Sequence, residues 1–236
     1  MSVIWIPYQA PITAGGDPSY SSVSLLLHCD GANNSTTFTD NSPSPKTASV
    51  FGDAKISTAQ SKFGGASALF DGNGDYIEYT VNTAFAFGTG NFTVECWVWR
   101  NGTQVDFAPL ISAGSSGGTS GSWVLGFGAT SESSSNKLRF TTGLTPVMFD
   151  AGVSPNQQWF HAAVARQGST VRLFVDGVQV ATMTSAADLT ESLIRITRGR
   201  GSAFYFNGYL DDIRITKGVA RYTGNFTPPS ASFPDA

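Results

Sequence analysis

The sequence predicts an all-β protein folded as an antiparallel two-sheet sandwich or jelly roll. Short apolar runs rich in Phe, Val, Ile and Leu follow one another along most of the 236 residues. The chain has 26 Gly and 11 Pro, which typically mark the turns between such strands. Many short strands with regular turn signals indicate a sandwich, and a chain of this length can form one as a single domain.

The first strands are expected between residues 23 and 100. Residues 23–31 (VSLLLHCDG) form an apolar run that a turn ends. Residues 66–80 (ASALFDGNGDYIEYT) are predicted to form two strands joined by a glycine-containing hairpin loop at 71–74. Residues 91–100 (NFTVECWVWR) carry large apolar side chains on both faces, which predicts a central strand with Trp97 or Trp99 mostly buried.

The second half of the chain continues the same pattern. Two strands (SWVLGFGA and NKLRFTTG) flank a serine-rich loop, and residues 159–182 are predicted to form three strands. Asp176-Gly177 between alternating apolar runs predicts a two-residue hairpin turn, with Gly177 at positive φ and Phe174 buried nearby. Residues 192–199 and 203–216 close the domain, and residues 185–192 (SAADLTES) suit a helical turn.

The last of these strands breaks the period of two. Leu210 and Ile213 are three residues apart, with Asp211 and Asp212 between them, so we expect a β-bulge there. A bulge turns a carboxylate inward, and a buried carboxylate needs a cation or several hydrogen-bond donors. We expect backbone N–H groups or an ion pair with Arg214 or Arg195 rather than a metal.

Six segments in the same order resemble a laminin-G-like, concanavalin A-like jelly-roll domain. They are LLLHCDG with TFTDNS, SKFGGASALFDGNGDYIEY, FGTGNFTVECWVW, WFHAAVARQGSTVRLFVDG and FNGYLDDIRITKGVARYTGNFTPP. The resemblance covers residues 21–234 and implies a domain at 21–236, preceded by an extended arm at 1–20. The tail DDIRITKGVARYTGNFTPP looks most like the version found in bacteriophage tail, fibre and capsid-decorating proteins.

That narrower resemblance implies a non-enzymatic virion structural protein, assembled in the host cytoplasm, whose partners are other virion proteins and copies of itself. The alternative is a glycan-binding module of a secreted or cell-surface protein, and display on a particle for adsorption to a host glycan would satisfy both. A glycoside-active enzyme is the third interpretation. Glucanases of this fold carry Glu-x-Asp-x-(x)-Glu on one strand, whereas the four glutamates here stand alone. His28 and His161 lie beside apolar residues and are expected to be structural.

No cofactor is expected, and calcium is left open as a structural ion. Some laminin-G-like domains bind Ca²⁺ through acidic side chains and carbonyl oxygens. The alternatives here are Asp30 with Asp212, and the DGNGD loop with Asp71 and Asp75, which we expect to be only a turn. The metal-binding residues therefore stay unassigned.

Sugars bind exposed aromatic faces, for which the sequence offers Trp123 beside a Gly/Ser loop and Tyr205 beside RGRGSAF. Neither is distinguished by sequence from an aromatic residue of the core. Cys29 and Cys96, the two cysteines, lie in apolar strand patterns and are expected to be buried and reduced.

The N-terminal arm carries the residues that we expect to bind a partner. Ile4, Trp5, Ile6 and Tyr8 are apolar, yet they precede a Gly-Gly-Asp-Pro joint. Such a strip suits a contact with another chain, or with a neighbouring copy, because large aromatic residues anchor such interfaces. The alternative is that the arm folds back on its own sandwich.

Charge and hydropathy exclude two classes of partner. The formal net charge is -3 and the pI about 5.3, without the basic face that nucleic-acid binding requires. No segment approaches the roughly 20 apolar residues of a membrane-spanning helix, so membrane insertion is not expected. The start of the chain also lacks the features of a secretory signal.

Overall fold

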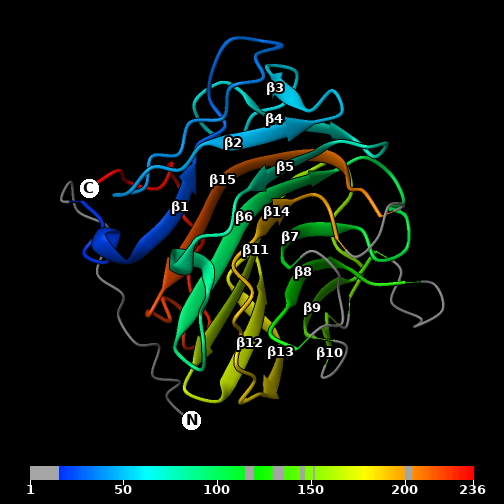
Figure 1. The fold of residues 1–236 in the computed structure, drawn as a ribbon. Helices are drawn as coiled ribbons and strands as arrows, with labels where there is room; N and C mark the ends of the chain where they lie inside the picture. Colours follow the sequence, from blue (N-terminus) through cyan, green and yellow to red (C-terminus); the bar gives the residue numbers. More distant parts are fainter. Residues whose placement is uncertain (1–15, 115–119, 130–135, 144–146, 151, 200–203) are drawn as a thin grey trace, which may run out of the picture.

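A computed structural model describes residues 16–114, 120–129, 136–143, 147–150, 152–199 and 204–236. Its strands form two antiparallel sheets packed face to face, which confirms the predicted sandwich (Figure 1). The first sheet has eight strands in the order β13-β12-β11-β6-β15-β4-β3, and β1 also pairs with β15. The second has seven, in the order β10-β9-β8-β7-β14-β5-β2.

The eight-stranded sheet contains β1 (Val23–Leu27), β3 (Lys55–Ser57), β4 (Ser67–Asp71), β6 (Phe92–Arg100), β11 (Trp159–Gln167), β12 (Thr170–Val175), β13 (Val178–Thr184) and β15 (Asn207–Lys217). The seven-stranded sheet contains β2 (Ala48–Phe51), β5 (Tyr76–Tyr79), β7 (Pro109–Ala113), β8 (Trp123–Phe127), β9 (Leu138–Thr142), β10 (Val147–Phe149) and β14 (Ile194–Ile196). Every strand pair that joins neighbours in these sheets is antiparallel.

The core lies between the sheets and follows from side-chain alternation. In β6, Phe92, Val94 and Val98 point into the core and are fully buried. The strand is central, as predicted, because β11 and β15 pair with its two edges. Trp97 and Phe174 are buried as expected, although both lie outside the main core on the outer side of this sheet.

The predicted hairpin at Asp176-Gly177 is confirmed. Asp176 has φ 48° and Gly177 has φ 76°, so both central residues of the turn between β12 and β13 adopt positive φ. Gly177 is also required by a close approach, because a Cβ there would lie 2.0 Å from the backbone oxygen of Phe226. Glycine is therefore needed both for the turn and for the passage of the C-terminal segment.

The hairpin predicted at residues 71–74 is wrong. β4 and β5 follow each other directly in sequence but belong to different sheets: β4 pairs with β15 and β3, and β5 with β14 and β2. The glycines turn the chain between layers, and the carboxylate of Asp75 accepts hydrogen bonds from the backbone N–H groups of Asp71 and Asp53. A local turn signal does not specify which strands pair, since that depends on distant partners.

The helical turn expected at residues 185–192 is also wrong. These residues form an isolated bridge with Gly88 at Leu189 instead. Short 3₁₀ turns lie at Tyr20–Ser22 and Thr83–Phe85 in the described chain. No helix in that part of the chain is long and apolar enough to cross a membrane. Cys29 and Cys96 are both buried and free, as predicted.

The outer face of the eight-stranded sheet is covered by the C-terminal segment, residues 218–236. Tyr222 and Phe226 stack on each other and pack against Phe174. Phe233 packs against β1 at Val23 and Leu26, and the red end of the chain lies beside β1 in Figure 1. The segment therefore covers the outer face of the eight-stranded sheet. The pocket described below lies on the other layer, the seven-stranded sheet.

Candidate functional site

The candidate site lies on the outer face of the seven-stranded sheet. Ile77, Ile111 and Ile196 point inward to the core, so their neighbours in each strand point outward. Strand register aligns these outward residues in a row across the sheet: Ser49, Glu78, Arg195, Ser112, Val124, Thr141 and Val147. The row is mostly polar, which is expected of a face that meets solvent and ligands rather than a core.

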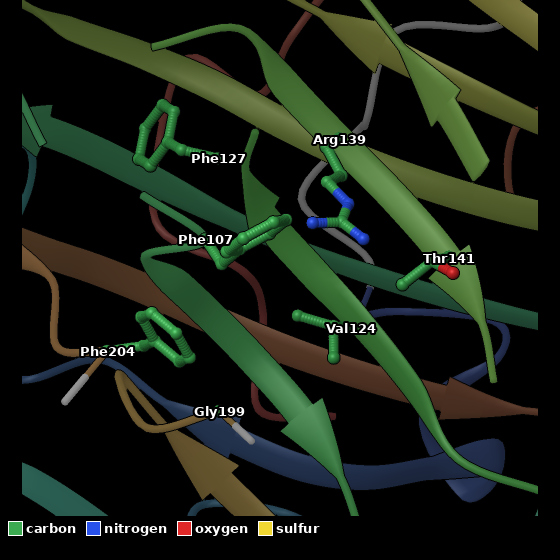
Figure 2. Close-up of a pocket in the computed structure, with 7 residues that line it drawn as sticks. All are labelled: Phe107, Val124, Phe127, Arg139, Thr141, Gly199 and Phe204. Carbon is green, nitrogen blue, oxygen red and sulfur yellow. The ribbon is translucent and has the colours of Figure 1, made fainter. Parts of the chain in front are cut away.

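A pocket with a volume of about 220 Å³ opens at this face (Figure 2). Phe107 precedes β7, Val124 and Phe127 belong to β8, and Arg139 and Thr141 belong to β9. Gly199 follows β14 and Phe204 precedes β15, so five separate segments supply the lining. The site exists only because the strand order places these segments side by side.

Aromatic rings and a guanidinium group give the pocket its chemistry. The rings of Phe107 and Phe204 meet edge to face with centroids 5.6 Å apart. The guanidinium carbon of Arg139 lies 4.9 Å from the centre of the Phe107 ring. Figure 2 shows Arg139 and Phe107 turned toward each other, with Thr141 further along the same strand, β9, and Val124 on the adjacent strand, β8. Aromatic faces beside one cation and one hydroxyl suit a ligand that has both apolar and polar faces.

Phe107 adopts a backbone conformation that is unusual for its side chain. Its φ is 59°, in the left-handed region that bulky residues rarely occupy. Such strain persists only where the surrounding structure enforces it, and it gathers at functional sites. Here the conformation places the ring between Phe204 and Arg139, so the strain serves the shape of the pocket.

The structure separates the two aromatic residues proposed from sequence as sugar-binding. Trp123 is fully buried in the core, where it stacks on Phe87, so that hypothesis is wrong. Tyr205 is half-buried and adjoins the pocket through its neighbour Phe204. Phe107, Arg139 and Phe204 were missed. Alternation in NKLRFTTG could have marked Arg139 as outward-facing, but no sequence signal links it to Phe107.

The bulge predicted at Asp211 and Asp212 is confirmed, and so are the backbone donors expected for their carboxyls. The pairing of β15 with β6 shifts by one residue between Asp211 and Arg214, and Asp212 has φ 46°. Both carboxyls are fully buried. Asp211 accepts hydrogen bonds from the backbone N–H groups of Lys62 and Phe63. Asp212 accepts one from the backbone N–H of Phe233 and lies 2.7 Å from Nδ1 of His28.

The arginine partners expected for these aspartates are engaged elsewhere. Arg214 binds Glu95 and Asp17, and Arg195 binds Glu78. The backbone donors expected as the alternative are the ones that the structure shows. Asp17 is itself buried and paired with Arg214 and Arg221, so the end of the segment assigned to the arm, residues 1–20, packs on the sandwich.

An acidic group that sequence analysis identified only in part lies at the turn between the sheets. One carboxylate oxygen each of Asp53, Asp71 and Asp75 lies within 4.8 Å of the others. Burial and the neighbouring carboxyls of Asp53 and Asp71 raise the pKa of Asp75 to about 6, against the effect of its backbone donors. Three carboxylates are the ligands that a hard cation prefers. Asp30 and Asp212 do not belong to this group.

The two histidines contact carboxylates in the packing of the C-terminal segment. The ring nitrogens of His28 each lie 2.7 Å from a carboxylate oxygen, one of Asp212 and one of Asp235. His161 is fully buried, with Nε2 3.2 Å from Glu95. Glu95 also binds Arg214 and accepts a hydrogen bond from the Tyr222 hydroxyl. These contacts explain why an isolated glutamate lies in a central strand, as a buried charge held by several donors.

The predicted partner-binding residues Ile4, Trp5, Ile6 and Tyr8 lie outside the described part of the chain. Their proposed role stays a prediction.

Comparison with known proteins identifies the family. Residues 71–221 match the family model described as the concanavalin A-like lectin/glucanases superfamily. The chain belongs to this superfamily. The match confirms the fold that the sequence resemblance implied. A comparison with curated protein sequences finds no match.

Solved structures of this superfamily fold include domain 4 of AbnA, a GH43 extracellular arabinanase from Geobacillus stearothermophilus, in complex with arabinotriose. It is 15% identical with a TM-score of 0.61, and the match covers 84% of this chain and 94% of that one. The binding domain of botulinum neurotoxin serotype D/C is 16% identical with a TM-score of 0.60, covering 85% and 50%. This chain therefore spans about half of that neurotoxin chain.

A third similar structure comes from a study of botulinum neurotoxin type C, whose cell entry depends on interaction with two ganglioside molecules. It is 18% identical with a TM-score of 0.58, covering 85% of this chain and 49% of that one. All three are similar to this chain in fold. None of the three is a bacteriophage protein, so they lend no weight to the narrower resemblance of the tail.

Proposed function

We propose that this domain is a non-enzymatic glycan-binding module and that the pocket at Phe107, Arg139 and Phe204 is its sugar site. The observation that carries the proposal is the pocket itself: two aromatic rings, a guanidinium group and a hydroxyl converge in about 220 Å³ on the outer face of the seven-stranded sheet. Ligand sites typically combine an apolar lining with a few placed polar groups. Two similar structures support a saccharide as the ligand: one is a complex with arabinotriose, and the other belongs to a neurotoxin whose cell entry depends on interaction with two ganglioside molecules.

The contacts of Glu95, the glutamate in the central strand β6, support sugar binding rather than sugar hydrolysis as the function of this domain. Glycoside cleavage needs two carboxyl groups facing one sugar bond, about 5 Å apart or more. Glu95 instead lies under the C-terminal segment on the opposite sheet, bound to Arg214 and Tyr222. Arg214 and other charges hold its pKa well below the usual range, against the effect of burial, so it is suited to neither a general acid nor an exposed nucleophile.

A glycan array, followed by titration calorimetry with the best ligand, tests the proposal. We expect Phe204→Ala to weaken binding at least about fivefold, because stacking of a flat ring on an aromatic side chain, as measured for nucleobases, contributes on the order of 1–3 kcal/mol. Phe63→Ala is the matched control, since Phe63 is half-buried against Trp97 on the other sheet. An array without a ligand, or equal affinity of wild type and Phe204→Ala, would contradict a sugar site in this pocket.

We further propose, from the resemblance of residues 211–229 alone, that a bacteriophage virion carries this module. The particle is assembled in the host cytoplasm, and residues 1–12 then dock it to another virion protein or a second copy. Deletion of residues 1–12 is expected to leave the circular dichroism spectrum unchanged and to abolish particle incorporation. Wild-type occupancy of the truncated chain on purified particles would exclude the arm as the anchor.

A further inference from the structure

A second cluster of side chains adjoins the pocket on the same sheet. The rings of Phe51 on β2 and Tyr76 on β5 stack with centroids 4.3 Å apart and planes 2° from parallel. The guanidinium carbon of Arg198 lies 4.4 Å from the centre of the Tyr76 ring. Tyr205 completes the cluster, with its ring centroid 6.5 Å from that of Tyr76. Phe51 is 38% exposed, and Arg198 and Tyr205 are half-buried.

Two backbone segments connect this cluster to the pocket. Arg198 directly precedes Gly199, and Tyr205 directly follows Phe204, and both Gly199 and Phe204 line the pocket (Figure 2). Arg198 and Tyr205 are also paired as an antiparallel bridge. The cluster and the pocket therefore lie next to each other on one face of the sheet.

The charge of Arg198 has no anionic partner in the described chain. Arg195, Arg214 and Arg221 each bind a carboxylate within 4.0 Å. Arg198 has no such ion pair, and its buried Nε has no hydrogen-bond acceptor among the described residues. A buried donor left unpaired is unfavourable. Its geometry suits a planar anion, because the guanidinium group binds a carboxylate through parallel hydrogen bonds.

The acidic residues around Tyr76 do not neutralise this arginine, and Glu78, two positions further along β5, pairs with Arg195. The carboxylate oxygen Oδ2 of Asp53 lies 3.5 Å from Nζ of Lys55. The two carboxylate oxygens of Asp75 accept hydrogen bonds from the backbone N–H groups of Asp53 and Asp71. The described ion pairs join none of these carboxylates to Arg198. An anionic ligand therefore has an available cation beside the Tyr76 ring, on which the exposed Phe51 ring stacks.

We propose that Phe51, Arg198 and Tyr205 form a second subsite, which binds a carboxylate-bearing sugar unit of an oligosaccharide whose neighbouring unit occupies the pocket. The inference rests on the proposed glycan-binding function and names its ligand class, an acidic glycan. Arg198 binds the carboxylate, and the Phe51 and Tyr205 rings contact the apolar face of the sugar. Sialic acids and uronic acids both offer this chemistry.

Calorimetry with two pairs of oligosaccharides tests the second subsite. One pair is a sialylated oligosaccharide and its sialic acid methyl ester, and the other is a uronic acid tetramer and its methyl ester. We expect one free acid to bind at least roughly tenfold more tightly than its own ester, since a charge-assisted bidentate pair is lost on esterification. The pair that shows this difference identifies the source of the carboxylate.

Arg198→Gln is expected to remove the preference for the acid, so that the acid and its ester bind this variant with similar affinity. Arg172→Gln, the same substitution on β12 of the opposite sheet, is the matched control and is expected to bind like wild type. Phe51→Ala, at an exposed position, is a second variant and is expected to weaken both the acid and its ester. Thermal melts establish that each variant is folded.

The outcomes separate the two proposals. Binding of an ester together with an acid preference that survives Arg198→Gln overturns the second subsite and leaves the pocket as the sugar site. Equal affinity of wild type for the acid and its ester in both pairs would likewise overturn the second subsite and leave the pocket as the sugar site. Failure of wild type to bind any of the four probes, together with an empty glycan array, overturns the proposed function and this inference with it.

Discussion

Individual side chains at the junction of β1, β15 and the C-terminal segment control how this fold responds to pH. His28 lies between two carboxylates, those of Asp212 and Asp235, and its side chain is 16% exposed. Burial alone would lower the pKa of His28, but hydrogen bonds and charges from Asp212 and Asp235 raise it to about 9. The protonated imidazole of His28 therefore bridges Asp212 on β15 and Asp235 in the C-terminal segment.

This pKa predicts a loss of stability in alkaline solution. The folded state holds its proton up to about pH 9, whereas the histidine of the unfolded chain releases its proton near pH 6.5, the ordinary value for this side chain. The stabilisation is therefore fully present below about pH 6.5 and is lost as the pH rises through 9. Its upper limit is about 3–4 kcal/mol, at 1.36 kcal/mol for each of about 2.5 pKa units, before solvent screening reduces it.

Urea denaturation at pH 6 and pH 9.5 measures this effect when wild type is compared with His28→Gln. The free energy of unfolding of wild type is expected to fall more between pH 6 and pH 9.5 than that of the variant, because the variant has no imidazole at position 28. Asp211, whose pKa burial raises to about 7, is present in both proteins, so the difference between them reports the contacts of His28 with Asp212 and Asp235. Equal losses in the two proteins would show that His28 is not the titrating group.

At the scale of elements, the C-terminal segment, residues 218–236, is a packed layer on the outer face of the eight-stranded sheet. Glu95 on β6 and His161 on β11 lie with Oε2 and Nε2 3.2 Å apart, so the outer face of this sheet contains buried polar groups. The segment supplies the matching donors and rings, with the Tyr222 hydroxyl 2.7 Å from Oε2 of Glu95. The sheet and its cover are therefore expected to unfold together.

Tyr222→Phe tests this coupling without changing the shape of the packed ring. The substitution is expected to cost about 1.5–3 kcal/mol, because a buried carboxylate loses a hydrogen bond. Tyr209→Phe on β15 is the control, since the Tyr209 hydroxyl has no hydrogen bond in the described chain. Urea midpoints give the comparison, and an equal, small effect of the two variants would contradict the role assigned to Tyr222.

At the scale of the whole molecule, the question is whether the fold needs a bound metal ion, or whether hydrogen bonds within the protein already satisfy its acidic turn. The turn between the sheets gathers Asp53, Asp71 and Asp75, but Asp75 already accepts two backbone hydrogen bonds and Lys55 neighbours Asp53. We therefore predict that folding requires no tightly bound ion.

Thermal melts with EDTA and with added Ca²⁺ test this prediction. The melting temperature is expected to stay nearly constant. A drop of many degrees in EDTA that Ca²⁺ reverses would overturn it. Asp71→Asn would then abolish the calcium response if the three-carboxylate group is the site, whereas Asp30→Asn would abolish it if the pair proposed from sequence is.

Alternation and turn chemistry are local properties, and for this reason the sequence determined much of the fold. The strand at 91–100, the three strands from Trp159 to Thr182, the turn at Asp176-Gly177 and the bulge at Asp211 and Asp212 were all predictable. The same local signals failed at residues 71–74, where a turn that resembles a hairpin carries the chain into the other sheet.

Only the tertiary structure decided which side chains meet. Trp123 and Tyr205 both lie beside glycine-rich loops, yet Trp123 is in the core and Tyr205 adjoins the pocket. Phe107, Arg139 and Phe204 are distant in sequence, and they converge because β14 pairs with β7 and β9 with β8. Strand order is fixed by the burial of whole faces and by hydrogen bonds between remote segments. A sequence pattern with a period of two records which face a residue occupies, but not which distant residue lies beside it.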